Sequence, residues 1–229
     1  MPIAVLADIV RSREILDRGE AQSIAEETFR RVERDIASAD GDESRRRLVT
    51  EALGAPVQPM RSTVGDEFQG VYPDLGAALA RVLLIRLALP EALDCRFGIG
   101  SGWIEPVPSA DREDLQDGSA WWNARAAIGR AHELQEGEVA ASRSWFAASD
   151  DDPLAATAPL VNAYLVARDQ LVGELRPRVR GSVYGWLTGR RQVDIARDTG
   201  VSQSAVSQAL SRGPATALVA GWNELLRRR

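Results

Sequence analysis

Short segments of strand length alternate with segments of helix length through the first 150 residues, and this order restricts the fold more than any other feature. Apolar runs or period-two alternation predict strands, and apolar residues at a spacing of three to four predict helices. The predicted strands are 3–10, the two halves of 56–72, 95–105 and 138–146, and the predicted helices are 20–38, 75–90 and 119–134. This order predicts an α+β fold with helices packed over a mostly antiparallel sheet. The polar stretch 39–47 is interpreted as a helix junction or loop.

The acidic segment SDDDP at 149–153 is interpreted as a linker, because only helical patterns follow it. We therefore predict two domains, residues 1–150 and residues 151–229. The second contains 11 arginines and 7 acidic residues, a balance of +4, although the whole chain has a net charge of −5. Such an uneven distribution predicts that any contact with nucleic acid lies in the last third.

The composition favours a cytoplasmic protein without a membrane partner. The apolar N-terminal run reaches Asp8 after a few residues, which is too short for a signal peptide or a membrane helix. Cys95 is the single cysteine and His132 the single histidine. The chain therefore has no basis for an internal disulfide or for a metal site built from cysteines and histidines.

Two carboxylates occupy the ends of predicted strands. Asp8 ends the first strand, and Asp66 lies at the turn between the two halves of 56–72. If these strands are neighbours, both carboxylates emerge at one edge of the sheet, where their charges repel. A divalent cation, Mg²⁺ or Mn²⁺, relieves that repulsion and uses one or two carboxylates together with substrate phosphates. The alternative is that Asp66 only occupies a turn position, where Gly-Asp is common.

Four segments resemble, in order and spacing, the strand-borne motifs of class III nucleotide cyclases. They are ADIVRSR at 7–13, TVGDEFQG at 63–70, RFGIGSGWIE at 96–105 and DGSAWWNAR at 117–125. The GDEF stretch is also similar to the hairpin of GGDEF diguanylate cyclases. Over nearly its whole length the chain resembles the SatD family, in which such a domain precedes a C-terminal helix-turn-helix. The resemblance implies a ferredoxin-like, palm-type sheet with covering helices, followed by an all-α DNA-binding domain.

The resemblance also implies roles for individual residues of the first domain. It implies metal ligation by Asp8, the backbone of Ile9 and Asp66, nucleotide binding by Ser12, Arg13 and Glu67, and a catalytic guanidinium from Arg125 or Arg130. Cyclases place an asparagine four residues before the catalytic arginine, whereas Asn123 lies two residues before Arg125. A lysine that reads adenine is also missing, since every cationic residue is arginine. These departures favour binding of a nucleotide over its turnover.

The segment RRQVDIARDTGVSQSAVSQALSR at 190–212 has the pattern of a helix-turn-helix. Ala196 allows two helices to approach closely, Gly200 supplies the turn, and Ser202 is suited to cap the second helix. The residues predicted to contact DNA are Ser202, Gln203, Ser204, Ser207, Gln208 and Arg212 on the second helix, with Arg190 and Arg191 beside them. The alternative is a helical hairpin that never touches DNA.

Two hypotheses of function follow. The first is a transcription regulator that binds double-stranded DNA as a homodimer and whose first domain binds or senses a nucleoside triphosphate with a divalent metal. The second is an active nucleotidyl cyclase or a related two-metal nucleotidyl transferase. A further alternative is a first domain that has lost its ligand and only dimerises.

Overall fold

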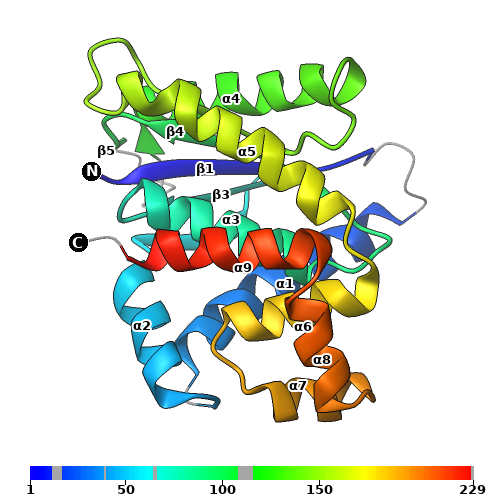
Figure 1. The fold of residues 1–229 in the computed structure, drawn as a ribbon. Coiled ribbons are helices and arrows are strands. Elements are labelled where there is room, and N and C mark those ends of the chain that lie inside the picture. The colour runs from blue at the N-terminus through cyan, green and yellow to red at the C-terminus, as the bar shows by residue number, and fades with distance from the viewer. Residues whose placement is uncertain (12–16, 39, 64–65, 108–115, 228–229) are drawn as a thin grey trace.

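The computed structural model describes residues 1–227 except 12–16, 39, 64–65 and 108–115. A five-stranded sheet in the order β2-β3-β1-β4-β7 lies at its centre (Figure 1). The strands are β1 (Ile3–Ile9), β2 (Gln58–Ser62), β3 (Glu67–Tyr72), β4 (Cys95–Ser101) and β7 (Ser144–Ala147). All neighbours are antiparallel except β4 and β7, which are parallel. The fold is therefore α+β with a mixed sheet, as the alternating sequence pattern predicts.

Helices cover both faces of this sheet and form the whole C-terminal part. The helices before residue 150 are α1 (Arg18–Ala37), α2 (Glu43–Leu53), α3 (Leu75–Ala88) and α4 (Ser119–Glu136). Those after it are the 3-10 turn η2 (Ala155–Thr157), α5 (Ala158–Gly173), α6 (Pro177–Leu187), α7 (Gln192–Thr199), α8 (Gln203–Leu210) and α9 (Gly213–Leu226). A two-stranded ladder joins β5 (Glu105–Pro106) to β6 (Gln116–Asp117). None of the described helices is both long and apolar enough to cross a membrane.

Helix α4 packs against β4, β7 and β1 on one face of the sheet, at the top of Figure 1. Two glycines of β4 allow it to approach the strand closely. A Cβ on Gly98 would lie 2.0 Å from the carbonyl oxygen of Ala124, and a Cβ on Gly100 would lie 2.1 Å from that of Ala120. This backbone contact fixes the rotation of α4 and hence the residues that it points at the end of β1.

The other face of the sheet packs against α1 and α3, and this core continues into the C-terminal helices. A single cluster of buried apolar residues includes Phe29, Leu83, Leu165 and Trp222, which lie on both sides of position 150. The buried carboxylate of Asp169 on α5 also accepts a hydrogen bond from Arg86 on α3 (2.7 Å). The helices after residue 150 are therefore packed directly onto the sheet and its covering helices.

Three sequence predictions differ from the structure in their extent. Residues 43–53 form α2, not a loop, and Asp42 caps it by accepting the N–H of Arg45 (2.9 Å). The inner face of α2 contains the buried Arg46, which donates to the carbonyl of Asp35 (3.3 Å), so the apolar pattern that signals a helix is incomplete. The predicted strand 138–146 is limited to β7, and the predicted strand 95–105 ends at Ser101, before Gly102 with φ 154°.

Candidate functional site

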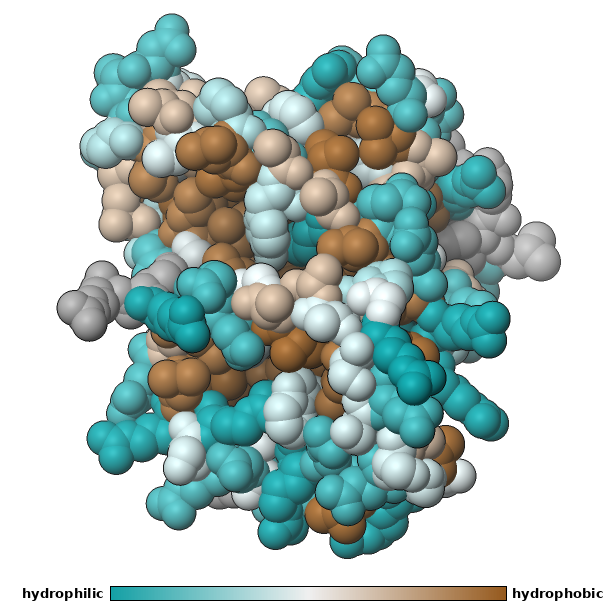
Figure 2. All heavy atoms as spheres, in the orientation of Figure 1, coloured by the Kyte–Doolittle hydropathy of each residue, from teal (hydrophilic) through white to brown (hydrophobic). Residues whose placement is uncertain are grey.

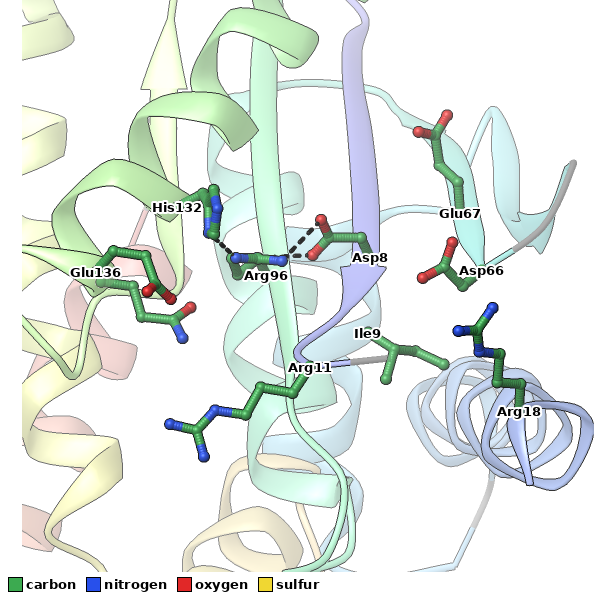
Figure 3. A pocket seen from close by; sticks show the side chains of 10 residues that line it. Asp8, Ile9, Arg11, Arg18, Asp66, Glu67, Arg96, His132 and Glu136 are labelled. Carbon is green, nitrogen blue, oxygen red and sulfur yellow. Dashed lines mark hydrogen bonds and ion pairs between the residues drawn. The ribbon is translucent and has the colours of Figure 1, made fainter. Parts of the chain in front are cut away.

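A polar cleft of about 540 Å³ lies where β1 ends, and we call it the Asp8 cleft (Figure 3). Strands β1 and β3, the start of α1 and the last turns of α4 contribute its lining. The lining residues are Asp8, Ile9, Arg11, Arg18, Asp66, Glu67, Arg96, His132, Gln135 and Glu136. Both acidic and cationic side chains line the cavity, so it suits a ligand that carries phosphate groups and a cation.

Asp8 lies between two charged residues of the neighbouring strands. The strand register places Glu67 of β3 opposite it on one side and Arg96 of β4 on the other. Its carboxylate accepts hydrogen bonds from Nε (2.9 Å) and Nη2 (3.3 Å) of Arg96, which also donates to Nδ1 of His132. Burial raises the pKa of Asp8 above its ordinary value, Arg96 acts in the opposite direction, and nearby Asp66 adds to the rise.

Asp66 enters the same cleft from the turn before β3. Figure 3 shows its carboxylate directed toward Asp8, with Arg18 from α1 on its other side. The structure thus brings together the two carboxylates that the sequence predicts as neighbours, because β1 and β3 are adjacent in the sheet. Ile9 lines the cleft beside them, whereas Ser12 and Arg13 lie outside the described residues.

Glu67 points away from Asp66 and toward α4. Its carboxylate forms a two-pronged ion pair with Arg125, with Nη2 to Oε1 at 2.7 Å and a second bond from Nη1 to Oε2. Arg125 therefore reaches the edge of the cleft but is already bound to an acid of the protein.

Arg130 is not brought to the cleft. It pairs with Glu133 (2.9 Å), and its guanidinium lies 5.8 Å from the ring centre of Trp145. Arg130 lies five positions after Arg125. On a helix of 3.6 residues per turn this spacing places the two arginines on different faces of α4. Of the two arginines predicted as catalytic, only Arg125 is near the site.

Five charged or titratable residues of the cleft were missed from the sequence: Arg11, Arg18, Arg96, His132 and Glu136. Arg11 has a φ of 55°, the left-handed region that residues other than glycine rarely adopt. Arg96 carried a signal, since it stands as a charged residue between Cys95 and Phe97 in an apolar strand. Such a residue needs a partner, and the strand register supplies Asp8.

The oxygen donors of the cleft fit a magnesium ion only in part. Within the ranges that the structure describes, no group of three or more histidines, cysteines and acids is placed to hold a metal. Both oxygens of Asp8 also accept from Arg96. Mg²⁺ needs only one or two carboxylates when phosphates supply further ligands. Asp8 and Asp66 therefore fit a cation that arrives with a nucleotide, provided that Arg96 moves from Asp8 to a phosphate.

Helices α7 and α8 meet at a tight turn and expose one polar surface. Gly200 ends α7 with φ 66°, and Ser202 caps α8 by accepting the N–H of Ala205 (3.2 Å). Val206 and Leu210 are buried under α8. The exposed residues of this surface include all six that the sequence predicts for α8 and its flanks: Ser202, Gln203, Ser204, Ser207, Gln208 and Arg212.

The arginines around α7 differ in how far they are engaged. Arg190 pairs with Asp198, and Arg191 pairs with Asp194 (2.7 Å). Both pairs are accessible to solvent, and exposed ion pairs of this kind are weak. Arg190 and Arg191 are thus positioned at the edge of the α7–α8 pair and can exchange their partners.

Contacts with α1 and α2 hold the α6–α7 corner against the first part of the chain. Tyr184 of α6 donates its hydroxyl to Asp35 near the end of α1 (2.5 Å). The guanidinium of Arg45 lies 3.3 Å from the ring centre of Trp186. The N–H of Asp42 also donates to the carbonyl of Gly189 in the α6–α7 turn (2.9 Å). Helix α1 consequently runs from the Asp8 cleft, which Arg18 lines, to the helices that hold α7 and α8.

Fold and site define an α+β protein with a charged cleft at the end of its central strand and a helical C-terminal part. The model of the SatD family matches residues 2–176, and the chain belongs to the SatD family. This match contains the whole sheet, the Asp8 cleft and α5, and it ends just before α6. Comparison with curated proteins and with solved structures gave no match.

Proposed function

We propose that this protein is a DNA-binding regulator whose sheet domain binds a nucleotide and a divalent cation in the Asp8 cleft. The observation that carries this proposal is the position of α1. Its first residue, Arg18, lines the cleft, and Asp35 near its other end binds Tyr184 of the helical part. A ligand that changes the contacts of Arg18 therefore acts on an element that also holds the DNA-reading helices.

The cleft supplies both kinds of group that a nucleotide with its metal needs. Arg11, Arg18 and Arg96 offer guanidinium groups for phosphates. Asp8 and Asp66 offer oxygen ligands for Mg²⁺ or Mn²⁺, which when bound neutralises phosphate charge. In this proposal Arg96 exchanges the Asp8 carboxylate for a phosphate as the ligand enters.

The strand order supports a palm-type sheet of the ferredoxin-like kind. Strands β1 to β4 are connected as βαββαβ and lie in the order β2-β3-β1-β4, which is the split βαβ arrangement. Asp8 and Asp66 then lie at the end of the sheet to which the resemblance to nucleotide cyclases assigns the metal and the substrate. The resemblance to nucleotide cyclases and this strand order support the same location for the ligand.

Sensing is favoured over turnover because the predicted catalytic set is not assembled. Asp8 is bound by Arg96, Arg125 is bound by Glu67, and Arg130 lies on another face of α4. The second candidate function, a nucleotidyl cyclase or a two-metal transferase, rests on the closeness of Asp8 and Asp66. Incubation with each nucleoside triphosphate and Mn²⁺ tests it, and a cyclic or linear nucleotide product would establish it.

The exposed surface of α8 suits the major groove of DNA. Gln203 and Gln208 can each pair with adenine in a bidentate manner, and Arg212, Arg190 and Arg191 can contact phosphates. Figure 2 shows that the end of the molecule with α7 and α8 is mostly hydrophilic. One such unit reads half a site, so we expect a homodimer on a nearly palindromic operator. This activity belongs in the cytoplasm, where nucleotides and DNA are both present.

Isothermal titration of ATP and of GTP, each with Mg²⁺ or Mn²⁺, tests the nucleotide site. We expect binding to the wild type that is lost in Asp66→Ala and retained in Glu133→Ala, a control that removes an acid of α4 outside the cleft. Equal binding by all three proteins would contradict a site at Asp66. Absence of binding to the wild type would leave a DNA-binding protein on a dimerisation scaffold.

DNA binding is tested by selecting operators from random duplexes and measuring affinity by fluorescence anisotropy, with and without the nucleotide. Gln203→Ala is expected to weaken binding about 5- to 150-fold and to relax sequence preference, because a bidentate base contact contributes ~1–3 kcal/mol. The nucleotide must bind one arrangement of the helices better than the other if it is to change operator affinity. An operator affinity that saturating nucleotide leaves unchanged would remove the sensing part of the proposal.

A further inference from the structure

A second pocket, of about 410 Å³, lies next to the Asp8 cleft between β3 and α4. Trp121, Trp122, Gln69 and Gln116 line it, and Glu67 lines both cavities. We propose that this tryptophan pocket binds the nucleobase of the nucleotide whose phosphates occupy the Asp8 cleft. The inference rests on the proposed function and adds the recognition of the base.

The two cavities lie on the same face of the sheet at the spacing that a nucleotide needs. Leu6 and Asp8 are two residues apart on β1 and therefore point to the same face, toward α4. Their partners on β3 are Gln69 and Glu67. Two residues of a strand span ~7 Å, which is close to the distance between a nucleobase and the first phosphate of its nucleotide. A single ligand can therefore occupy both cavities.

Trp122 provides a rigid aromatic surface in this pocket. It is exposed to 58%, yet its indole N–H donates to Asp117 (3.0 Å). Its ring also meets Trp103 edge to face, with the ring centres 5.6 Å apart and the planes at 79°. An exposed indole held in one orientation loses little further freedom when a planar base stacks on it.

The pocket also contains unused hydrogen-bonding groups. Over the part of the chain that the structure describes, the indole N–H of Trp121 and the amide oxygen of Gln116 are buried without a hydrogen-bond partner. An unpaired buried group of this kind costs ~1–3 kcal/mol. In the proposed complex the two side chains turn this donor and this acceptor toward the polar edge of the nucleobase, which presents both kinds of group. The amide of Gln69 adds a further group of the same chemistry.

The proposal is tested on the full-length protein with ATP, GTP, adenosine and guanosine as probes. Binding is measured by titration calorimetry and by quenching of tryptophan fluorescence. The variants are Trp122→Ala, Trp122→Phe and Trp121→Phe, and the matched control is Trp145→Phe, which changes a tryptophan of β7 outside the pocket. Circular dichroism checks that each variant folds, and sedimentation reports its oligomeric state.

We expect Trp122→Ala to weaken nucleotide binding about 5- to 150-fold, which corresponds to the ~1–3 kcal/mol of one stacked base. Trp122→Phe should keep most of the affinity and lose the part of the quenching that comes from Trp122, and the control should change neither. Trp121→Phe should weaken binding at least about 5-fold, because it removes the unpaired N–H together with part of the indole ring, and the lost packing should lower stability slightly.

Three results would overturn the inference, and they differ in what they leave standing. If Asp66→Ala abolishes nucleotide binding but the tryptophan variants bind normally, the phosphate site stands and the base lies elsewhere. If no probe binds the wild type, the nucleotide site and the base pocket both fail. If Trp122→Ala changes only the oligomeric state, Trp103 and Trp122 form an interface with a second copy.

Discussion

Two aspartates of this protein bind arginine in different surroundings, Asp169 inside the helical core and Asp8 in the cleft. Asp169 is fully buried and accepts from Arg86 (2.7 Å), from Arg168 (2.9 Å) and from the N–H of Arg143 (2.7 Å). Burial alone would raise the pKa of Asp169, but the two guanidinium groups and the N–H outweigh it and hold the pKa below its ordinary value.

Asp8 has one arginine partner, and its side chain is exposed to 31%. Here burial outweighs Arg96, and the pKa of Asp8 lies above its ordinary value. The presence of an ion pair therefore does not distinguish an acid that only holds the fold from one that is left open to a ligand. Asp169 accepts from two arginine side chains and a backbone N–H inside the protein, whereas Asp8 has one arginine partner and is open to a further cation.

The largest expected effect is that of Asp169→Asn on stability. Loss of the charge leaves Arg168 buried without the acid that it binds and leaves Arg86 with only Asp94, at 4.0 Å. Breaking a buried pair in this way costs ~3–5 kcal/mol. Urea unfolding measures the free energy of unfolding, and Asp8→Asn is the matched variant, with an expected change within ~1 kcal/mol. If the two variants lost similar amounts of unfolding free energy, Asp169 and Asp8 would not differ in how much they stabilise the fold.

Asp169 and Asp8 should contribute to the free energy of unfolding with opposite dependence on pH, and each variant removes one of these contributions. The lowered pKa of Asp169 stabilises the fold above the ordinary aspartate pKa of about 4, and this contribution is lost as the pH falls through the folded value. The raised pKa of Asp8 has the reverse effect, because its contribution is present at low pH and is lost as the pH rises through the folded value. Unfolding curves of the wild type and both variants between pH 3 and pH 7 would show it. Parallel curves would contradict the assigned directions.

An intermediate effect on stability is expected from breaking the hydrogen bond between Tyr184 and Asp35. Asp35 lies half-buried and accepts this bond from the Tyr184 hydroxyl. Tyr184→Phe removes a hydrogen bond to a charged group and should lower stability by ~1.5–3 kcal/mol. It should leave nucleotide affinity unchanged and weaken the effect of the nucleotide on operator binding. Denaturant unfolding and anisotropy measure the two quantities. If the nucleotide changed operator affinity as strongly in Tyr184→Phe as in the wild type, Tyr184 would not belong to the connection between the Asp8 cleft and the α7–α8 pair.

The smallest effect on stability is expected for Arg96→Met. Its partner Asp8 is partly solvated, so we expect a loss within ~1 kcal/mol. The pKa of Asp8 should rise further, because burial then acts without the opposing cation. Carbon-13 NMR of the aspartate carboxyl groups, with Asp8→Asn to assign the signal, follows this pKa. An unchanged value would mean that Arg96 does not set the ionisation of Asp8.

The sequence predicted the closeness of Asp8 and Asp66 only on the condition that β1 and β3 are neighbours, and the antiparallel register, with Asp8 opposite Glu67, meets that condition. It did not predict that Arg96 binds Asp8, since that contact depends on the register between strands 88 residues apart. It also left Arg125 and Arg130 as equal candidates. The choice between them depends on the rotation of α4, which Gly98 and Gly100 fix through backbone contact.

Helix α2 shows a different limit of the sequence pattern. A buried arginine, Arg46, occupies a place where an apolar residue would have revealed the helix. The binding of its guanidinium to backbone carbonyls is a tertiary interaction that no local pattern contains. The α7–α8 pair was easier to predict, because the turn at Gly200 and the cap at Ser202 are local features.

The C-terminal helices lie beyond the family match, yet they are not a detachable unit. Arg180 of α6 donates to the carbonyls of Arg86 and Leu89 at the end of α3, and Trp222 of α9 is exposed to only 1% in the shared core. Grafting a foreign DNA-binding unit after residue 176 would leave those carbonyls and that core uncovered. Under the proposed function, a change of DNA target during evolution is therefore open mainly to the solvent-facing residues of α8, while the inner faces of α6 and α9 must keep their shape.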